Sequence, residues 1–428
     1  MRTVAILTLG CKLNQADSQA LARELGARGC RVTERPEEAD AVIVNSCTVT
    51  HVADRKARHL VRLSRRLAPE AIVALTGCYA DSGGSRLVQL TGADLVLGNR
   101  YKPTLVRRLL ALWGEDGQDG CYEPLPAEPA LRTRAFVKIQ EGCNDVCAFC
   151  IVPRVRGREE SVPIAQVVAQ ARAHGDEGVR EVVLTGTQLG NYGRDMGLAD
   201  GLRRLLAALL AETRIPRIRV SSLQAQNLSP ELLGLWQDPR LCRHLHIPLQ
   251  SGSDRVLARM RRRYDAALYR RAVALAREHI GDVAITTDVI VGFPGETDEE
   301  FQETYRLCQE VGFAAIHVFP YSRRPGTAAN LMADHVAAPV KRDRTGRLLA
   351  LAQEASTAFR RRFWGQTVAV LWEGETGGGC CWQGLTDNYI RVYTRNADDL
   401  RNRLLLTRLG DLVEDGVWGA GGLGEGWA

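Results

Sequence analysis

The chain has 428 residues, of which 45% are hydrophobic and 25% are charged, with a formal net charge of +6. This length allows two or three domains with sizeable cores, and the composition is ordinary for a soluble globular protein. No apolar run approaches the roughly 20 residues that span a bilayer, which excludes a membrane-spanning helix. The small positive charge permits a polyanionic partner without requiring one.

The first segment, residues 1–114, alternates strands with helices. Short aliphatic and β-branched runs predict buried strands at 3–9, 40–45, 71–76 and 94–98. Helices are expected near 18–29 and 53–67. Because crossover helices join parallel strands, this pattern predicts an open parallel sheet, the first part of an α/β protein. The apolar start is too short for a secretion signal and is expected to be the first strand.

Three cysteines of this segment, Cys11, Cys47 and Cys78, each follow the end of a predicted strand. The carboxyl ends of parallel strands share one edge of the sheet, so these thiols are expected to converge. Buried core cysteines are the alternative, since cysteine is often buried. Gly10 and Gly77 stand beside two of them and allow close backbone approach, which favours a three-cysteine cluster site.

Residues 115–133 are rich in proline, glycine and acidic residues and are expected to form a linker. The second segment, 134–362, begins a new alternating series and is predicted to be an incomplete (β/α)6 barrel. Its strands are expected at 134–140, 180–186, 217–222, 244–248, 283–292 and 314–320. Its helices are expected near 163–174, 199–212, 230–237, 266–279, 297–311 and 340–362.

The string GCNDVCAFC contains Cys143, Cys147 and Cys150 at CxxxCxxC spacing. Three thiolates can bind three irons of a 4Fe–4S cluster and leave the fourth iron open, whereas most clusters have four cysteine ligands. Zinc is the alternative, but zinc sites prefer short C-x(2–4)-C pairs with a fourth Cys or His nearby. The chain has 12 cysteines, which in the absence of a secretion signal indicates a reducing cytoplasm and metal ligation.

The last segment, 363–428, alternates apolar runs with glycine-containing turns and is predicted to be a small all-β barrel. It holds five Arg and nine Asp or Glu, a net charge of −4, so broad electrostatic attraction cannot hold a polyanion there. Tyr389, Trp382 and Arg391 are candidates for local contacts with unstacked nucleotides. Cys380 and Cys381 are expected to be an exposed thiol pair. The remaining cysteines are expected in the core or linker: Cys30, Cys121, Cys242 and Cys308.

With Phe149 before its last cysteine, the CxxxCxxC string resembles the signature of radical S-adenosylmethionine (SAM) enzymes. That resemblance implies that SAM binds the open iron and is cleaved to a 5′-deoxyadenosyl radical, chemistry that the cofactor supplies. The whole chain resembles the methylthiotransferase family of these enzymes, in which an N-terminal domain and a C-terminal TRAM domain flank the radical-SAM barrel. The resemblance implies two 4Fe–4S clusters, an auxiliary one on Cys11, Cys47 and Cys78 and a SAM-cleaving one on Cys143, Cys147 and Cys150.

Within the family, the string TLGCKLNQADS at 8–18 resembles the branch that acts on threonylcarbamoyladenosine in tRNA. The strings at 186–193 and 384–392 favour the same branch. This implies methylthio transfer to carbon 2 of the modified adenine beside the anticodon, with SAM as both methyl donor and radical source. It also implies three partners: the tRNA anticodon stem-loop, a reductant such as flavodoxin or ferredoxin, and a sulfur donor.

Polar residues at the ends of the barrel strands are candidate SAM contacts: Thr185, Gly186, Thr187, Ser221, Ser222, Gln250 and Gly292. Helix caps and turns use the same residue types and are the alternative for each. His246 is a candidate proton shuttle or a satisfied strand-end histidine. Asp288 and Glu296 are candidate positioning groups or solvated carboxylates.

Arginine clusters at 55–66, 259–263 and 360–362 are candidates for phosphate contacts, although such runs are usually solvated faces. Three other functions stay open at this stage. The first two are the same chemistry on isopentenyladenosine in tRNA and on a ribosomal-protein residue. The third is a non-catalytic iron–sulfur RNA-binding protein, which the open coordination sites disfavour.

Overall fold

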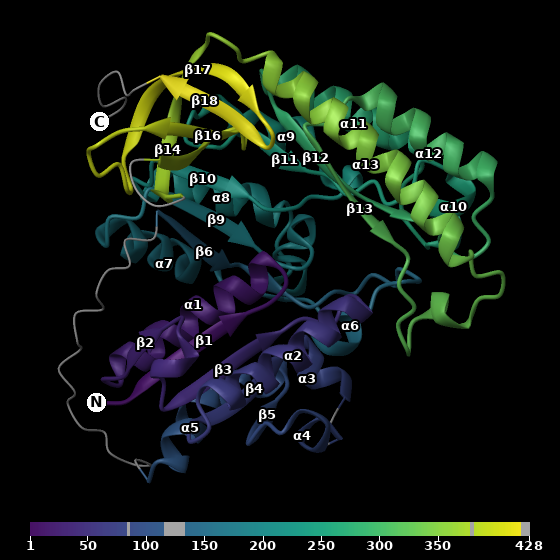
Figure 1. The fold of residues 1–428 in the computed structure, drawn as a ribbon. Helices are drawn as coiled ribbons and strands as arrows, with labels where there is room; N and C mark the ends of the chain where they lie inside the picture. Colours follow the sequence, from purple (N-terminus) through teal and green to yellow (C-terminus); the bar gives the residue numbers. More distant parts are fainter. Residues whose placement is uncertain (84–85, 115–132, 377–380, 421–428) are drawn as a thin grey trace. The chain divides into compact units, whose positions relative to one another are not determined.

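The computed structural model describes residues 1–83, 86–114, 133–376 and 381–420 (Figure 1). The chain divides into two compact units. The first comprises Met1–Ala130, Glu141–Glu160 and Ser322–Asn330, and the second comprises Leu131–Gln140, Ser161–Tyr321 and Leu331–Ala428. This grouping differs from the segments expected at 1–114, 134–362 and 363–428, which remain a prediction; 115–132 of the expected linker lie outside the described residues. No helix in the described part of the chain is long and apolar enough to cross a membrane.

The first unit contains a five-stranded sheet in the order β2-β1-β3-β4-β5, with every pairing parallel. Its strands are β1 (Thr3–Thr8), β2 (Arg31–Thr33), β3 (Ala41–Ser46), β4 (Ile72–Gly77) and β5 (Leu95–Leu97). Its helices are α1 (Lys12–Ala27), α2 (His51–Leu67), α3 (Cys78–Gly83), α4 (Arg86–Thr91), α5 (Leu105–Leu112) and the short α6 (Val152–Val155). The predicted open parallel sheet is therefore confirmed.

Both faces of this sheet are covered, as its continuous apolar strands require. On one face, Ile6 and Ile43 pack with Leu25 of α1 and Leu109 of α5. On the other face, Val42, Val44 and Leu75 pack with Ala57 and Val61 of α2. The alternation of side chains along β3 supplies both cores from one strand.

Two local features of this unit differ from the sequence expectation. Helix α1 begins at Lys12, immediately after Cys11, where a start near Ser18 was expected. Cys11 is the extended residue that precedes the helix. Strand β2 was not expected, because it has only three residues and no clear alternation of buried and exposed side chains. One of its side chains is exposed and two are half-buried.

The second unit contains the six predicted barrel strands, arranged as two three-stranded parallel sheets. One has the order β10-β9-β6 and the other β11-β12-β13. The strands are β6 (Arg134–Lys138), β9 (Glu181–Thr185), β10 (Arg217–Val220), β11 (His244–His246), β12 (Ala284–Val291) and β13 (Ala315–Pro320). A single parallel bridge, Ile218 to Leu241, links the two sheets. This arrangement is the expected incomplete (β/α)6 barrel.

Helices cover the outer face of these strands and share one large apolar core with them. They are α7 (Ile164–Asp176), α8 (Gly201–Glu212), α9 (Pro230–Leu233), α10 (Asp254–Arg259), α11 (Ala266–His279), α12 (Asp298–Val311) and α13 (Ala338–Arg361). Two two-residue strands, β7 (Gln140–Glu141) and β8 (Glu160–Ser161), bracket the loop 142–159.

The C-terminal strands close into a small barrel in the order β14-β15-β16-β18-β17, which confirms the predicted all-β, TRAM-like fold. They are β14 (Thr367–Glu375), β15 (Cys381–Thr386), β16 (Arg391–Arg395), β17 (Leu404–Val413) and β18 (Gly416–Ala420). The core of this barrel contains Trp372, Trp382 and Val392 together with Phe359 and Phe363. Trp382 is thus buried, and the expectation that it stacks on nucleotides is wrong.

A buried ion pair links the small β-barrel to the parallel strands β9 and β10 inside the second unit. The Arg219 guanidinium donates to both carboxylate oxygens of Glu181, at 2.7 and 3.0 Å, and to the carbonyl oxygen of Asp387 at 2.7 Å. Both side chains of the pair are fully buried. Burial alone would raise the pKa of Glu181, but the charge and hydrogen bonds of Arg219 hold it below the ordinary value.

We expect Glu181→Gln to lower the melting temperature by about 10 °C, because it leaves a buried guanidinium unpaired at a cost of about 3–5 kcal/mol. Glu212→Gln is the matched control, since its pair with Arg172 is exposed and should contribute less than about 1 kcal/mol. The lowered pKa makes the Glu181 contribution present above about pH 4.3 and lost as the pH falls through its folded value. Thermal unfolding followed by circular dichroism checks this, and equal melting temperatures for both variants would contradict it.

Candidate metal centres

The three N-terminal cysteines lie at one edge of the sheet of the first unit. Cys11 follows β1, Cys47 follows β3 and Cys78 begins α3 directly after β4. These strands are neighbours in the sheet and parallel, with Thr8 paired to Asn45 and Ser46 paired to Gly77. The sheet therefore brings the three cysteines to the same edge, as expected from the sequence.

Close backbone approach accompanies this arrangement. Gly10 has φ +101°, and a Cβ atom there would lie 2.6 Å from Cβ and 3.0 Å from Sγ of Cys47. Gly77 has φ +92°, and a Cβ atom there would collide with the backbone of Ser46. Only glycine fits both positions without a shift of the neighbouring chain.

The electrostatics of the three thiols show that they interact. Burial, together with the neighbouring Cys78 and Cys11 thiols, raises the pKa of Cys47 to about 11 against the opposing effect of a backbone N–H at Val49. A thiolate at one position thus disfavours a thiolate at the next. A bound cation would reverse this preference, because metal ligation requires deprotonated cysteines.

Arg156 supplies positive charge beside this set, and no sequence pattern marks this residue. Its Nε donates to Sγ of Cys78 at 3.3 Å, while its terminal nitrogens contact Glu141 at 2.5 Å and Asp17 at 3.4 Å. Its side chain is 3% exposed. Burial lowers the pKa of Arg156, but Cys78, Asp17 and Glu141 together raise it above the ordinary value.

Two more donors complete this network. Nδ2 of Asn99 lies 3.6 Å from Sγ of Cys78 and donates to the carbonyl oxygen of Val155 at 2.8 Å. The ammonium group of Lys102 is buried 2.7 Å from the carboxylate of Asp17. The neutral Asn99 amide thus helps to orient Cys78, while Lys102 balances the charge of Asp17 beside Arg156.

The second trio lies in the loop 142–159 of the same unit. Cys143 donates its backbone N–H to Gly157, and Cys150 donates to Cys147, both at 3.1 Å. Burial raises the pKa of Cys143 to about 11, and the Asp145 N–H, 3.4 Å from Sγ, opposes that rise. Cys147, Cys150 and Phe149 are half-buried. The loop thus presents three thiols on a short, hydrogen-bonded turn.

A small buried cluster connects the two loops. Cys78 packs with Ile151 and Val155, which directly follow the second trio in the chain. Arg156, which follows Val155 in the chain, also donates to Cys78. The two cysteine sets therefore belong to one compact unit, and their use as metal ligands remains a prediction.

The candidate SAM contacts lie at strand ends of the second unit. Thr185 is the last residue of β9, Ser221 and Ser222 follow β10, and Gly292 follows β12. Gln250 follows β11 with φ +64° and pairs with Val289 of β12.

Several of these candidates also have local structural partners. The side-chain oxygen of Gln140 accepts from the N–H of Thr187 at 3.0 Å, and a Cβ atom on Gly186 would lie 2.8 Å from the Gln140 carbonyl oxygen. Glu296 accepts from the N–H of Gly292 at 2.9 Å and pairs with Arg344 at 2.5 Å. Glu296 is therefore buried and is not a solvated carboxylate. Binding of SAM by these residues stays a prediction.

The arginine clusters divide into structural and exposed members. Arg360 donates to the carbonyl oxygens of Val413 and Gly416 at 2.9 Å, and Arg259 pairs with Glu300 at 2.6 Å. On α2, four basic residues are exposed: Arg55, Lys56, Arg62 and Arg66. Arg261 and Arg263 of the second cluster and Arg361 and Arg362 of the third are exposed as well, so helix α2 carries the largest exposed basic group of the three.

Three of the remaining cysteines are buried, as expected, whereas Cys381, which was expected to be exposed, is half-buried. Cys30, Cys242 and Cys308 are buried, and burial raises the pKa of both Cys242 and Cys308 to about 12. Cys381 is half-buried in β15, whereas Cys121 and Cys380 lie outside the described residues.

Comparison with known proteins places this architecture in a family. Residues 137–308 match the radical SAM superfamily, and residues 3–98 match the uncharacterized protein family UPF0004. A threonylcarbamoyladenosine tRNA methylthiotransferase of Bacillus subtilis is 36% identical over 96% of this chain and 94% of its own length. The chain belongs to the radical-SAM methylthiotransferase family.

Other members of the methylthiotransferase family show how its branches overlap. A threonylcarbamoyladenosine enzyme of Thermotoga maritima is 35% identical over 97% of this chain and 96% of its own length. A tRNA-2-methylthio-N(6)-dimethylallyladenosine synthase of Caldicellulosiruptor saccharolyticus is 33% identical over 95% of this chain and 90% of its own length. The similarity to members of both branches thus extends over nearly the full chain.

The radical-SAM fold is shared with a more distant enzyme. The radical SAM methyltransferase TsrM from Kitasatospora setae superposes with a TM-score of 0.57 at 16% identity, covering 77% of each chain. Membership of the methylthiotransferase family makes this protein an enzyme that uses SAM and a 4Fe–4S cluster. The CxxxCxxC loop fits that cluster, because it offers three thiols and belongs to a segment held by backbone hydrogen bonds.

Proposed function

We propose that this enzyme adds a methylthio group to carbon 2 of N6-threonylcarbamoyladenosine beside the anticodon of tRNA. Two of the relatives described above act, by their names, on threonylcarbamoyladenosine in tRNA. The string TLGCKLNQADS supports the same branch. The non-catalytic alternative is set aside, since the family is one of enzymes.

The proposal assigns two 4Fe–4S clusters to the two trios. Cys143, Cys147 and Cys150 hold the cluster that supplies the electron for SAM cleavage, and Cys11, Cys47 and Cys78 hold an auxiliary cluster that carries the sulfur. The observation that supports it most is the meeting of Cys11, Cys47 and Cys78 at the ends of three adjacent parallel strands. Packing of Cys78 against Ile151 joins the two sites in one unit.

The chain's own residues have distinct tasks in this scheme. Arg156 offsets the negative charge of the auxiliary thiolates and orients Cys78. Thr185, Gly186, Thr187, Ser221, Ser222, Gln250 and Gly292 line the strand ends where SAM binds, in both of its roles, and Phe149 packs beside the SAM-cleaving cluster. The exposed basic residues of α2 contact tRNA phosphates. A flavodoxin- or ferredoxin-type reductant and a sulfur donor complete the cycle in the cytoplasm.

Mass spectrometry of tRNA nucleosides from cells that lack the gene tests the substrate. We expect methylthio-threonylcarbamoyladenosine to disappear while its unmethylthiolated precursor accumulates. The dimethylallyladenosine branch is the second candidate, because a relative of that branch is 33% identical over most of the chain. Loss of the methylthio-dimethylallyl nucleoside instead would overturn the substrate assignment, and unchanged nucleosides would direct the search to ribosomal proteins.

A further inference from the structure

Three side chains of types that commonly bind metal ions come together within the second unit. His246 ends β11, Asp288 lies in β12 and His317 lies in β13, three neighbouring strands of one parallel sheet. Asp288 is paired in register with His317, and His246 is paired with Thr286, two residues before Asp288. The sheet itself therefore sets their spacing.

All three side chains project from the face of the sheet opposite the helices. Leu245, Val289 and Ile316 alternate with them along the strands and are buried in the core shared with the helices. On the other face, the side chains of His246 and Asp288 are 15% and 30% exposed, and His317 is exposed. A small ion can thus reach all three from the open side.

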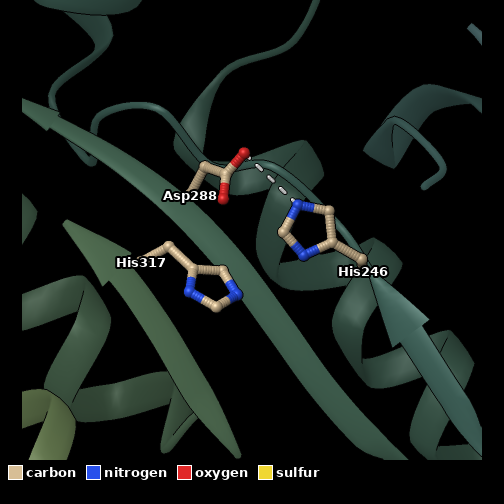
Figure 2. Close-up of side chains that lie close together, drawn as sticks. All are labelled: His246, Asp288 and His317. Carbon is tan, nitrogen blue, oxygen red and sulfur yellow. Dashed lines mark ion pairs between the residues drawn. The ribbon is translucent and has the colours of Figure 1, made fainter. Parts of the chain in front are cut away.

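Figure 2 shows the imidazole rings and the carboxylate turned toward one another. One ligand atom from each residue lies within 4.8 Å of the others, and Nε2 of His246 is 3.4 Å from Oδ2 of Asp288. The rings of His246 and His317 have centroids 5.9 Å apart. Modest rotation of the side chains would bring the three ligand atoms close enough to bind one first-row metal ion. The metal–ligand bonds of such an ion are about 2.0–2.2 Å long.

A hydroxyl group orients His246. Nδ1 of His246 lies 3.0 Å from Oγ1 of Thr286, which directs Nε2 of the same ring toward Asp288. Metal-bound histidines usually have their second ring nitrogen held in this way by a polar group of the protein. The carboxylate supplies the negative charge that two neutral imidazoles lack.

We propose that His246, Asp288 and His317 form a binding site for one divalent transition-metal cation, of the iron(II), manganese(II) or zinc class. Two imidazoles and one carboxylate on one side of an ion are typical of such sites, and they leave coordination positions open on the other side. The open positions face away from the helices and can take water or an oxygen ligand. The site contains no cysteine. Its nitrogen and oxygen ligands therefore favour different metal ions from those favoured by the thiolates of the two trios.

Manganese(II) tests this site, because it prefers nitrogen and oxygen ligands to thiolates. The anaerobic holoenzyme, freed of loose divalent ions with a chelator, is titrated with manganese(II) chloride while the electron paramagnetic resonance signal of free ion is measured. We expect one ion to bind per chain, and His317→Ala and Asp288→Asn each to weaken binding at least about tenfold. Thr286→Val should weaken binding by about tenfold through loss of the orienting hydroxyl.

His279→Ala is the matched control, since this histidine lies at the end of α11 and its Nδ1 contacts the carbonyl oxygen of Leu275. It should bind manganese(II) like the parent, and all variants should keep the parent's iron content. Absence of binding in the parent, or an affinity equal to the parent's in Asp288→Asn and His317→Ala, would show a hydrogen-bonded group only and overturn the proposal. The titration needs no tRNA, so its failure would leave the proposed methylthio transfer untouched.

Discussion

Replacing Cys47 with alanine is expected to abolish methylthio transfer to tRNA while SAM cleavage continues. Cys47 sits between Cys11 and Cys78 at the edge of the sheet, and its thiol interacts with both. The two remaining thiolates are too few to hold a cluster that needs three cysteine ligands. The other trio, Cys143, Cys147 and Cys150, lies in a separate loop and keeps its ligands. Product and 5′-deoxyadenosine are measured by liquid chromatography and mass spectrometry in one reaction.

Two further variants make this result specific. Cys30→Ala removes a buried core cysteine of the same unit and should leave both products unchanged apart from a small loss of stability. Cys143→Ala should abolish SAM cleavage and therefore methylthio transfer. Full methylthio product from Cys47→Ala would remove the N-terminal trio from the reaction.

Replacing Arg156 with methionine is expected to lower the free energy of unfolding by about 3–5 kcal/mol, as breaking a buried ion pair does. It is also expected to lower the occupancy of the auxiliary cluster. The substitution leaves Asp17 and Glu141 without the guanidinium that contacts them both. It also removes a charged donor from Cys78. The reduction potential of any cluster retained there should become more negative, because loss of positive charge disfavours the added electron.

Arg154→Met is the matched control, since Arg154 is exposed and donates to the carbonyl oxygen of Gly326. Arg156→Lys keeps the charge without the planar fork and should recover part of the potential but not full occupancy. Iron content and a redox titration followed by electron paramagnetic resonance provide the two readouts. An unchanged potential in Arg156→Met would show that the residue acts on packing alone.

Much of the fold was predictable because buried parallel strands leave a local signature. The runs at 3–9, 40–45 and 71–76 are apolar on both faces, so β1, β3 and β4 and the cysteines after them could be located from the sequence alone. The spacing of Cys143, Cys147 and Cys150 is equally local. The small β-barrel followed from alternation and glycine turns.

What the sequence did not predict depends on contacts between distant residues. Arg156 contacts Asp17, 139 positions earlier, and no local pattern marks it among the many arginines of the chain. His317 becomes a candidate ligand only through its register with Asp288 on the neighbouring strand. The burial of Trp382 likewise depends on closure of the barrel. This residue was expected to face solvent, but the closed barrel places it in the core.

The division of the chain into compact units could not be predicted from the sequence either. The loop 142–159 and residues 322–330 join the N-terminal sheet in one unit. Contacts such as Ala329 N–H to the Ala148 carbonyl oxygen, at 2.7 Å, and Arg324 to Asp54, at 2.8 Å, support this grouping. None of these contacts has a sequence signal, because each depends on how separate segments pack.

The central claim is that each trio holds its own cluster, and iron counting on anaerobically prepared protein tests it most directly. We predict about eight irons per chain in the parent and about four in each of two variants, one lacking Cys11, Cys47 and Cys78 and the other lacking Cys143, Cys147 and Cys150. About four irons in the parent, or zinc in place of iron at either trio, would contradict the account.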